Sequence, residues 1–212
     1  MIETLPRVVP AEPGKPVRPE AAAAQRNSRE IAENPAVWSG DSAREVVRRY
    51  TELASGWDDE RGGYRPVPLA DALDRGGPLP AGLCVEAGAG TGLLTPLLAA
   101  VWPRVVSLDL TPEMIRRSGA AWRLIGDAAR LPLPDASASA VVLADVPLFA
   151  AEVVRVLAPD GVVVWSNALG TGAPHHVPIS TVVGALDAAA GARPFHAVTS
   201  EAGWGLWAVL RR

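Results

Sequence analysis

The sequence is poor in residues that cross-link a chain or gather around a metal ion. Cys84 is the single cysteine among 212 residues, so an intrachain disulfide and a cysteine-based metal cluster are both excluded. Cys84 lies within an apolar run, and a lone buried thiol is compatible with a reducing compartment. We therefore predict a fold that is stabilised by its core alone and has no metal site.

Long apolar segments and a surplus of basic residues are also missing. Residues 1–18 lack the apolar stretch of a signal peptide, and no apolar run approaches the ~20 residues that cross a bilayer. We therefore expect a cytoplasmic protein that does not associate with membranes. The formal net charge is −3, whereas a protein that binds nucleic acid through phosphates needs a basic face. Nucleic acid is thus not an expected partner.

The residues that are present are typical of a globular domain with an appendage. Hydrophobic residues make up 49% and charged residues 20% of the chain, which is ordinary for a soluble protein. Residues 1–36 are rich in proline, alanine and charge and lack a sustained apolar period, so we expect a disordered arm there. Residues 37–78 are expected to form a helical lid. In this segment Ser42 and Glu45 make a capping-box pattern before a helix that runs to about Leu53, followed by a loop over 57–64 and a short helix around 68–73.

Residues 79–212 alternate between strand-like and helix-like patterns. We predict strands at 83–85, 104–108, 122–125, 140–144, 162–166, 195–199 and 204–210, helices at 93–100, 149–157 and 181–190, and a turn at 159–161. Such alternation indicates a mostly parallel sheet with helices on both faces. Only a short turn at Gly203 joins the last two strands, so they must be antiparallel. The predicted fold class is α/β, a Rossmann-like, doubly wound, mostly parallel seven-stranded sheet with one antiparallel strand near the C-terminus.

A glycine-rich loop follows the first strand of this region. Gly88, Gly90 and Gly92 allow sharp turns and the close approach of a ligand, and the helix behind them presents unpaired N–H groups and a positive dipole end. A nicotinamide or flavin cofactor would require G-x-G-x-x-G, but Leu93 stands where the third glycine should be, which disfavours a nucleotide-dependent oxidoreductase. Glu86, just before the loop, suits a ligand's ammonium group better than a pyrophosphate. A ligand that carries both a carboxylate and an ammonium group is an amino acid.

Two further acids end the next two strands. Asp109 lies 19 residues beyond Gly90, and an acid at this position can accept hydrogen bonds from both hydroxyls of a ribose. Asp127 ends the following strand and can accept a hydrogen bond from an adenine amino group. Because the carboxyl ends of neighbouring parallel strands border one crevice, Glu86, Asp109 and Asp127 are expected to line a common nucleoside site.

These residues lie in four motifs that resemble those of the class I S-adenosylmethionine (SAM)-dependent methyltransferases. The likeness is to the small methyltransferase-domain proteins, a type that includes ubiquinone and menaquinone biosynthesis enzymes. Residues 86–92 are similar to the family's first motif, 106–109 to its second, 126–135 to its adenine-binding segment, and 152–161 to the segment before its fifth strand. The resemblance covers roughly residues 50–210. It implies a SAM-dependent methyltransferase whose SAM-binding domain is residues 79–212.

The resemblance also implies a set of cofactor-binding residues. By moiety, Glu86, Gly88 and Gly90 hold the methionine part of SAM, Asp109 holds the ribose, and the adenine lies against Leu110 and Met114. The adenine edge is read by Asp127 and the backbone N–H of Ala128. Tyr50 belongs to the region that forms a lid in similar proteins, where an aromatic face can cover the sulfonium by cation–π attraction. The full set is Glu86, Gly88, Gly90, Gly92, Asp109, Leu110, Met114, Asp127, Ala128 and Tyr50.

The sequence departs from the family's pattern around its fourth strand. Ser139 stands where that strand often begins with an acid. Residues 144–149 read Ala-Asp-Val-Pro-Leu-Phe, which is not the Asn/Asp-Pro-Pro-aromatic motif of many amino and nucleobase methyltransferases. We therefore favour O- or C-methylation over N-methylation.

Three residues are candidates for the chemical step. Methyl transfer is an in-line displacement to which orientation can contribute ~7–11 kcal/mol, and a base is needed only when the nucleophile must lose a proton. His175 and His176 follow the fifth strand and Asp145 ends the fourth; ordinary loop packing is the alternative for the two histidines. The leading hypothesis is a methyltransferase that acts on an unidentified small molecule and leaves S-adenosyl-L-homocysteine (SAH) as product. The alternative is a SAM- or SAH-binding regulator or scaffold without methyl transfer.

Overall fold

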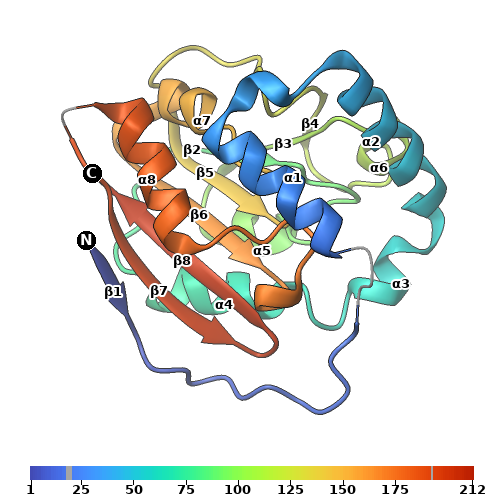
Figure 1. The fold of residues 1–212 in the computed structure, drawn as a ribbon, viewed down its shortest axis with the longest axis horizontal. Helices are drawn as coiled ribbons and strands as arrows, with labels where there is room; N and C mark the ends of the chain where they lie inside the picture. Colours follow the sequence, from blue (N-terminus) through green and yellow to red (C-terminus); the bar gives the residue numbers. More distant parts are fainter. Residues whose placement is uncertain (18–20, 192) are drawn as a thin grey trace.

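The computed structural model describes residues 1–17, 21–191 and 193–212 and shows one eight-stranded sheet (Figure 1). The strand order across the sheet is β1-β7-β8-β6-β5-β2-β3-β4. The strands are β1 (Ile2–Thr4), β2 (Leu83–Ala87), β3 (Arg104–Asp109), β4 (Trp122–Ile125), β5 (Ala138–Ala144), β6 (Leu157–Asn167), β7 (His196–Ala202) and β8 (Gly205–Arg211).

The direction of the strands confirms the predicted α/β, Rossmann-like fold. Every pair is parallel except the two that include β8, which runs antiparallel to both β6 and β7. Gly203 lies in the turn between β7 and β8 with a φ of +56°, a conformation that glycine adopts at little cost. The sheet has eight strands rather than the predicted seven, because β1 adds to the edge beside β7.

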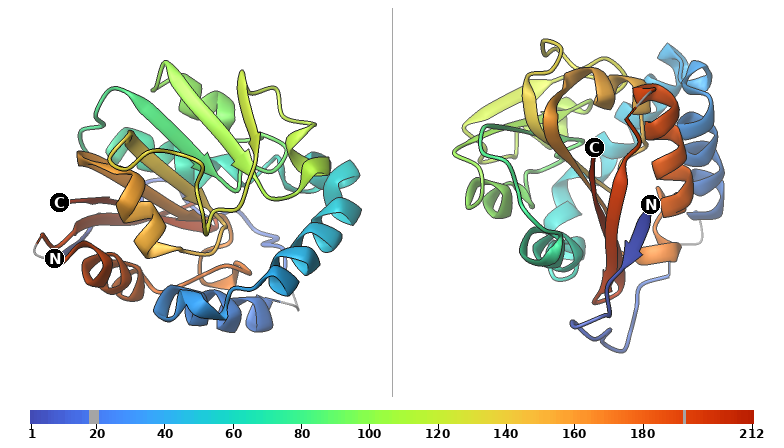
Figure 2. Two further views of the ribbon diagram at one scale, coloured as in Figure 1. Left: turned by 90° about the horizontal axis from the view of Figure 1, so that it is seen from above. Right: turned by 90° about the vertical axis from the view of Figure 1, so that its left-hand side faces the viewer.

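Helices cover both faces of this sheet. They are α1 (Ala21–Glu33), α2 (Gly40–Leu53), α3 (Trp57–Arg61), α4 (Pro66–Arg75), α5 (Thr95–Ala99), α6 (Pro112–Ile115), α7 (Ala150–Val156) and α8 (Ile179–Ala190), with short 3-10 turns η1 (Pro35–Val37), η2 (Ala54–Gly56) and η3 (Gly170–Gly172). Figure 2 shows α8, with α1 beside it, on one side of the sheet and α4 on the other.

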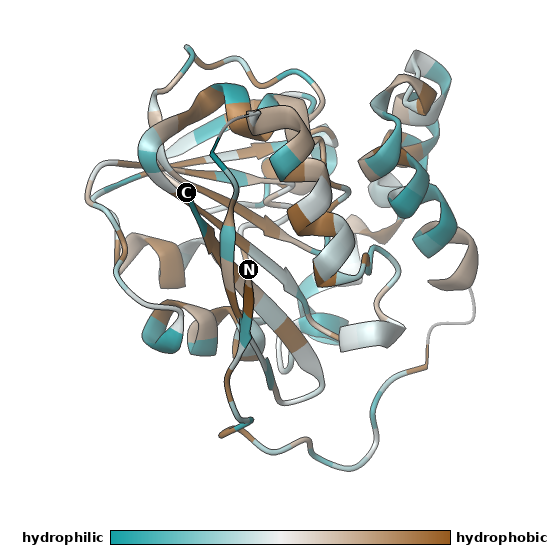
Figure 3. Cartoon of the chain, turned by 60° about the vertical axis from the view of Figure 1, so that its left-hand side comes forward, coloured by the Kyte–Doolittle hydropathy of each residue, from teal (hydrophilic) through white to brown (hydrophobic). Residues whose placement is uncertain are grey.

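Two buried clusters, one on each face, hold these layers together. On one face, Val153 of α7 and Leu186 of α8 pack with strand residues such as Val163. On the other, Leu69 of α4 and Leu98 of α5 pack with the opposite side chains of the same strands. Central strands buried on both faces must be apolar throughout, and β5 and β6 are predominantly hydrophobic in Figure 3.

The expectation of a disordered arm over residues 1–36 is wrong for the residues that the structure describes. Ile2–Thr4 pairs in parallel with residues 197–199, and α1 packs against α8. Composition misled because Ile31 is the only large apolar residue of α1. That residue is nevertheless only 1% exposed. Residues 18–20 of the expected arm lie outside the described residues.

Smaller differences concern the ends of elements. Ser39, rather than Ser42, caps α2, with its hydroxyl accepting a hydrogen bond from the Ser42 N–H at 3.2 Å. The expected loop at 57–64 begins with the short helix α3, and the expected turn at 159–161 lies within β6. Across the described ranges, every helix is too short or too polar to span a membrane.

Candidate cofactor site

The carboxyl ends of β2, β3, β4 and β5 open into a cavity of about 510 Å³. This volume lies in the range of small-molecule sites. The lining includes Glu86 at the end of β2, Asp109 at the end of β3, Asp127 after β4 and Asp145 after β5. The sheet therefore brings four acids, each from a different strand end, around one space, as the sequence predicted for the first three.

Gly88 and Gly90 of the glycine loop line this cavity, whereas Gly92, also expected to bind the cofactor, does not. Gly88, Gly90 and Gly92 all have positive φ, at +70°, +59° and +77°. A Cβ on Gly88 would lie 2.3 Å from Val146, and one on Gly92 would lie 2.2 Å from the Ser118 hydroxyl. A Cβ on Gly90 would meet only Trp57, at 3.9 Å. Gly90 thus has no packing reason to lack a side chain and presents bare backbone to the cavity.

Glu86 is buried, with 4% of its surface exposed. Its Oε2 accepts hydrogen bonds from Thr95 Oγ1 at 2.6 Å and Ser107 Oγ at 2.7 Å. Burial raises the pKa of the Glu86 carboxyl, and the two hydroxyl hydrogen bonds oppose that rise. One oxygen of Glu86 therefore ties the glycine loop to β3 and to the helix behind it.

Asp109 holds the glycine loop from the neighbouring strand. Its Oδ2 accepts a hydrogen bond from Gly90 N, and its Oδ1 accepts one from Thr111 N, each at 2.7 Å. Burial raises the pKa of Asp109, and both backbone hydrogen bonds act against this. A carboxylate has about four lone-pair sites, so each Asp109 oxygen retains acceptor capacity toward the cavity.

Asp127, the third of the predicted acids, is hydrogen-bonded to a residue of the lid segment. Its Oδ2 accepts a hydrogen bond from the Trp38 indole N–H at 2.9 Å, and its Oδ1 accepts one from Ala129 N at 2.8 Å. The Trp38 ring also contacts Phe149 edge to face, with centroids 5.4 Å apart. Leu110 and Met114, expected against an adenine ring, and Ala128, expected to read its edge, line the same cavity.

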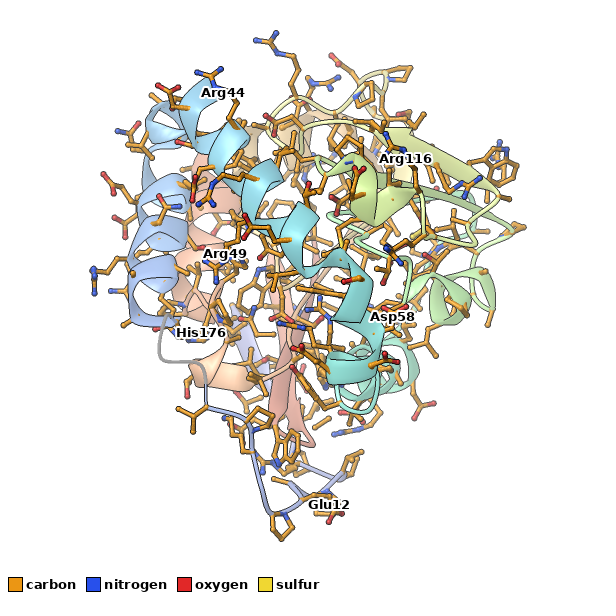
Figure 4. The ribbon with its side chains drawn as sticks, turned by 90° about the vertical axis from the view of Figure 1, so that its right-hand side faces the viewer. Glu12, Arg44, Arg49, Asp58, Arg116 and His176 are labelled. Atoms are coloured by element: carbon orange, nitrogen blue, oxygen red, sulfur yellow. The ribbon has the colours of Figure 1, made fainter. Side chains whose placement is uncertain are left out.

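Helix α3 contacts the glycine loop, and residues of both α2 and α3 line the cavity. Thr91 Oγ1 donates a hydrogen bond to Asp58 Oδ1 of α3, and Figure 4 labels Asp58 on this stretch of helix next to the body of the domain. Tyr50 and Trp57 both line the cavity, with ring centroids 5.5 Å apart. The Arg61 guanidinium stacks over the Trp57 ring at 4.1 Å. The aromatic face expected from the sequence is thus present, with an arginine against it.

His175 lies in a hydrogen-bonded chain at one wall of the cavity. Its Nδ1 is 2.9 Å from Ser28 Oγ of α1, and its Nε2 is 3.1 Å from the Tyr50 hydroxyl of α2. Burial lowers the pKa of His175 to about 4 and raises that of Tyr50. His175 is therefore neutral near pH 7 and a weak base.

The other two catalytic candidates differ in their surroundings. His176 does not line the cavity; its Nδ1 lies 3.1 Å from Asn167 Oδ1, and its ring contacts Trp165. Asp145 does line the cavity, but its Oδ2 lies 3.3 Å from Nη1 of Arg65.

Sequence reasoning missed Arg65 and Ser28. Ser28 lies in the segment expected to be disordered, and its partner His175 follows 147 residues later. Arg65 lies in the charged segment expected to form the lid, and its side chain is only 13% exposed. The sequence carries no local signal for either contact, since the contact of Arg65 depends on how the lid packs on the sheet and the contact of Ser28 depends on how α1 packs there.

Comparisons with known proteins agree with this geometry. A family model described as a methyltransferase domain matches residues 85–165. The chain is 36% identical over 146 residues to malonyl-[acyl-carrier protein] O-methyltransferase of Serratia marcescens. That alignment covers 59% of this chain and 56% of the relative, so the chain spans about half the length of the curated relative it matches.

Solved structures share the fold. A complex of DhpI with SAH superposes with a TM-score of 0.65 at 21% identity, covering 82% of this chain and 98% of that one. A Haloferax volcanii chain, solved as a complex between the Trm112 methyltransferase activator and a methyltransferase, gives a TM-score of 0.63 at 16% identity, covering 76% of this chain and 96% of that one. At these identities the likeness concerns the fold.

Proposed function

We propose that this chain, which carries a class I SAM-dependent methyltransferase domain, binds SAM in the cavity above the glycine loop and transfers its methyl group to a small molecule. One observation carries the proposal. The bare backbone of Gly90 faces a cavity that is bordered by acids from separate strand ends. This arrangement combines close approach to backbone with acceptors for hydroxyl and amino groups, which a nucleoside attached to an amino acid requires.

The cofactor roles follow the order of the strands. Asp109 accepts hydrogen bonds from the ribose hydroxyls with the acceptor capacity that Gly90 N and Thr111 N leave. Leu110 and Met114 pack on the adenine, and Asp127 with the Ala128 N–H reads its edge. Glu86 fixes the loop that contacts the methionine part. Because the Trp38 indole donates to Asp127 Oδ2, adenine binding requires Trp38 to share or release that oxygen.

The residues at the acceptor end orient the nucleophile and exclude water. When bound, SAM would supply a sulfonium methyl group that the nucleophile attacks in line, with SAH leaving as the neutral thioether. Tyr50 and His175 present a hydroxyl and a neutral imidazole to this space, and burial lowers the pKa of His175 to about 4, so strong proton abstraction is not their role. We assign His175 to holding Tyr50 and the acceptor, and His176 to packing of the loop.

The acceptor atom that we favour is oxygen. The relative in Serratia marcescens is an O-methyltransferase, and the segment after β5 lacks the motif of many amino and nucleobase methyltransferases. We further propose that residues 37–78 act as a lid, because α3 contacts the glycine loop through the hydrogen bond from Thr91 to Asp58 and Tyr50 of α2 lines the cavity.

Isothermal titration with SAM and SAH tests cofactor binding. Both ligands should bind, and Asp109→Ala should weaken both, because it removes the ribose acceptor and the Gly90 contact. Failure of either ligand to bind at millimolar concentration refutes the proposal. Incubation with methyl-labelled SAM and fractionated small-molecule extracts then tests transfer. Binding without any labelled product favours the alternative of a SAM-binding regulator or scaffold.

A further inference from the structure

Ser28 of α1 is fully buried and forms a hydrogen bond with the loop that follows β6. Its exposed fraction is 0%, and its Oγ lies 2.9 Å from Nδ1 of His175. Gln25, also on α1, donates hydrogen bonds from its Nε2 to the carbonyls of Thr171 and Ala173 in the same loop, at 2.9 and 2.8 Å. The contact between Ser28 and His175 is therefore part of a junction with several hydrogen bonds.

The burial of Ser28 determines which atom donates in this contact. A serine within a helix can donate to the carbonyl four residues earlier, but among the described residues the one hydrogen-bond partner of the Ser28 hydroxyl is His175 Nδ1. If Nδ1 carried a proton, the hydroxyl hydrogen of Ser28 would be buried without an acceptor, which is costly. Ser28 therefore donates and Nδ1 accepts.

This direction fixes the direction of the next hydrogen bond. Burial lowers the pKa of His175 to about 4, so the ring is neutral near pH 7, and a neutral imidazole that accepts at Nδ1 carries its proton on Nε2. Nε2 lies 3.1 Å from the Tyr50 hydroxyl, so the imidazole donates and the Tyr50 oxygen accepts. The phenolic hydrogen of Tyr50 has no second hydrogen-bond partner among the described residues, and Tyr50 lines the cavity.

We propose that Ser28 is a positioning residue that, through His175, makes Tyr50 a hydrogen-bond donor to an oxygen of the methyl acceptor that bears no hydrogen. Carbonyl and carboxylate oxygens are of this class. Ser28 itself does not line the cavity. This inference rests on the proposed function, and it adds a chemical feature of the acceptor and the residue outside the cavity that selects it.

A fixed donor gives the acceptor site a preference that a lone tyrosine lacks. A tyrosine hydroxyl can donate or accept, so without its neighbours Tyr50 could turn to suit a hydroxyl, an amino group or a carbonyl. The chain from Ser28 removes this choice before any ligand arrives, and a preorganised donor needs no rearrangement at the moment of reaction. The site should therefore disfavour acceptors that offer only a donated hydrogen at this position.

NMR of the protein with nitrogen-15-labelled histidine tests this direction without any ligand. The sequence has three histidines, so His175→Gln assigns the signals of His175. The chemical shift of a ring nitrogen changes strongly when it carries a proton, and wild-type protein at pH 7 should show His175 protonated on Nε2. A ring protonated on Nδ1 would overturn the proposal.

Two variants identify the hydroxyl that sets the tautomer. Ser28→Ala removes the donor to Nδ1 and should produce a mixture of the two tautomers. Tyr50→Phe should keep the proton on Nε2, because Ser28 still donates to Nδ1. The matched control is Ser200→Ala, which changes another buried serine, 3% exposed, whose hydroxyl donates to the Leu5 carbonyl and which does not line the cavity. It should keep the wild-type tautomer, and so would Ser28→Ala if the proposal were wrong.

Methyl transfer shows whether the tautomer matters for the reaction. The probe is methyl-labelled SAM with limiting amounts of the small-molecule fraction that takes up most label. The initial rate of Ser28→Ala should fall in proportion to the fraction of His175 that loses its Nε2 proton, because only the competent population binds the acceptor productively. Tyr50→Phe should lose at least about tenfold, since a positioned donor contributes on the order of 10²–10³ to the rate. Ser200→Ala should keep the wild-type rate.

The outcomes separate this inference from the proposed function. If no fraction takes up label, the proposed methyl transfer is wrong and the role of Ser28 in it is wrong as well. If transfer occurs but Ser28→Ala changes the tautomer without changing the rate, only the positioning role is overturned. Mass spectrometry of the labelled product gives a further check. A product without a carbonyl or carboxylate oxygen at or next to the methylated atom would overturn the assignment of Tyr50 as a donor to the acceptor.

Discussion

Replacing Gly90 with alanine separates ligand contact from backbone strain. Gly90 has a φ of +59°, and an L-residue there costs roughly 1–2 kcal/mol. For a domain of this size, each kcal/mol lowers Tm by about 2–4 °C, so we expect Tm to fall by about 2–8 °C. The added Cβ meets nothing closer than Trp57 at 3.9 Å, and the variant should fold.

Cofactor affinity should fall for a different reason. The new methyl group projects into the space where the ligand lies against the loop, and overfilling a packed site costs typically 1–3 kcal/mol. At about 1.4 kcal/mol per factor of ten, SAH affinity measured by titration calorimetry should drop about 5- to 150-fold. If Gly90→Ala binds SAH with wild-type affinity, the proposal that the ligand lies against Gly90 is wrong.

Gly191→Ala is the control for strain alone. Gly191 ends α8 with φ +71° and ψ −114°, a combination that L-residues also avoid, and a Cβ there has nothing within 4 Å. This variant should lower Tm at least as much as Gly90→Ala and leave SAH affinity unchanged. Equal weakening of SAH binding by both variants would show that loss of stability, rather than contact, explains the effect.

Two further predictions concern pH and the far side of the molecule. Burial lowers the pKa of His175 from 6.5 to about 4, so between these pH values the unfolded chain binds this proton more readily than the folded chain. The free energy of unfolding should therefore decrease by about 2 kcal/mol as the pH is lowered from 7.5 to 5. His175→Gln should remove that part of the pH dependence in denaturant titrations, and an unchanged dependence would contradict the direction of the pKa shift. The Trp207 indole N–H donates a hydrogen bond to Asp71 Oδ2 at 2.6 Å within the core. Trp207→Phe should therefore lower the free energy of unfolding by about 1–3 kcal/mol without changing SAH affinity. A weakened affinity would mean that this region is energetically coupled to the cavity.

The central part of the fold could be predicted from sequence because its signals are local. The alternation of buried strands with helices from Leu83 onward predicted the parallel sheet, and the short turn at Gly203 predicted the antiparallel pair. The glycine spacing and the acids Glu86 and Asp109 identified one end of the sheet as the candidate site, because the carboxyl ends of parallel strands share an edge.

The remaining features depend on contacts between distant parts of the chain. β1 is a strand because β7 offers it an edge, and nothing in its own three residues indicates this. The contact of Trp38 in the lid with Asp127 and that of Ser28 in α1 with His175 join residues 89 and 147 positions apart. Asp145 could be predicted as a site residue because it follows a strand. Its ion pair with Arg65 could not, because it depends on how residues 37–78 pack against the sheet.

The contacts of α1 also set the order in which the cavity can be completed. Gln25 donates hydrogen bonds to the carbonyls of Thr171 and Ala173, and Ser28 contacts His175. The contacts of α1 therefore cannot form until residues roughly 150 positions further along the chain have been synthesised. Contacts of such sequence separation slow folding because a long loop must close first. During synthesis on the ribosome, the glycine loop and its strands can associate while this wall is still missing. This wall of the binding site can therefore be completed only after residues 171–175 have been synthesised.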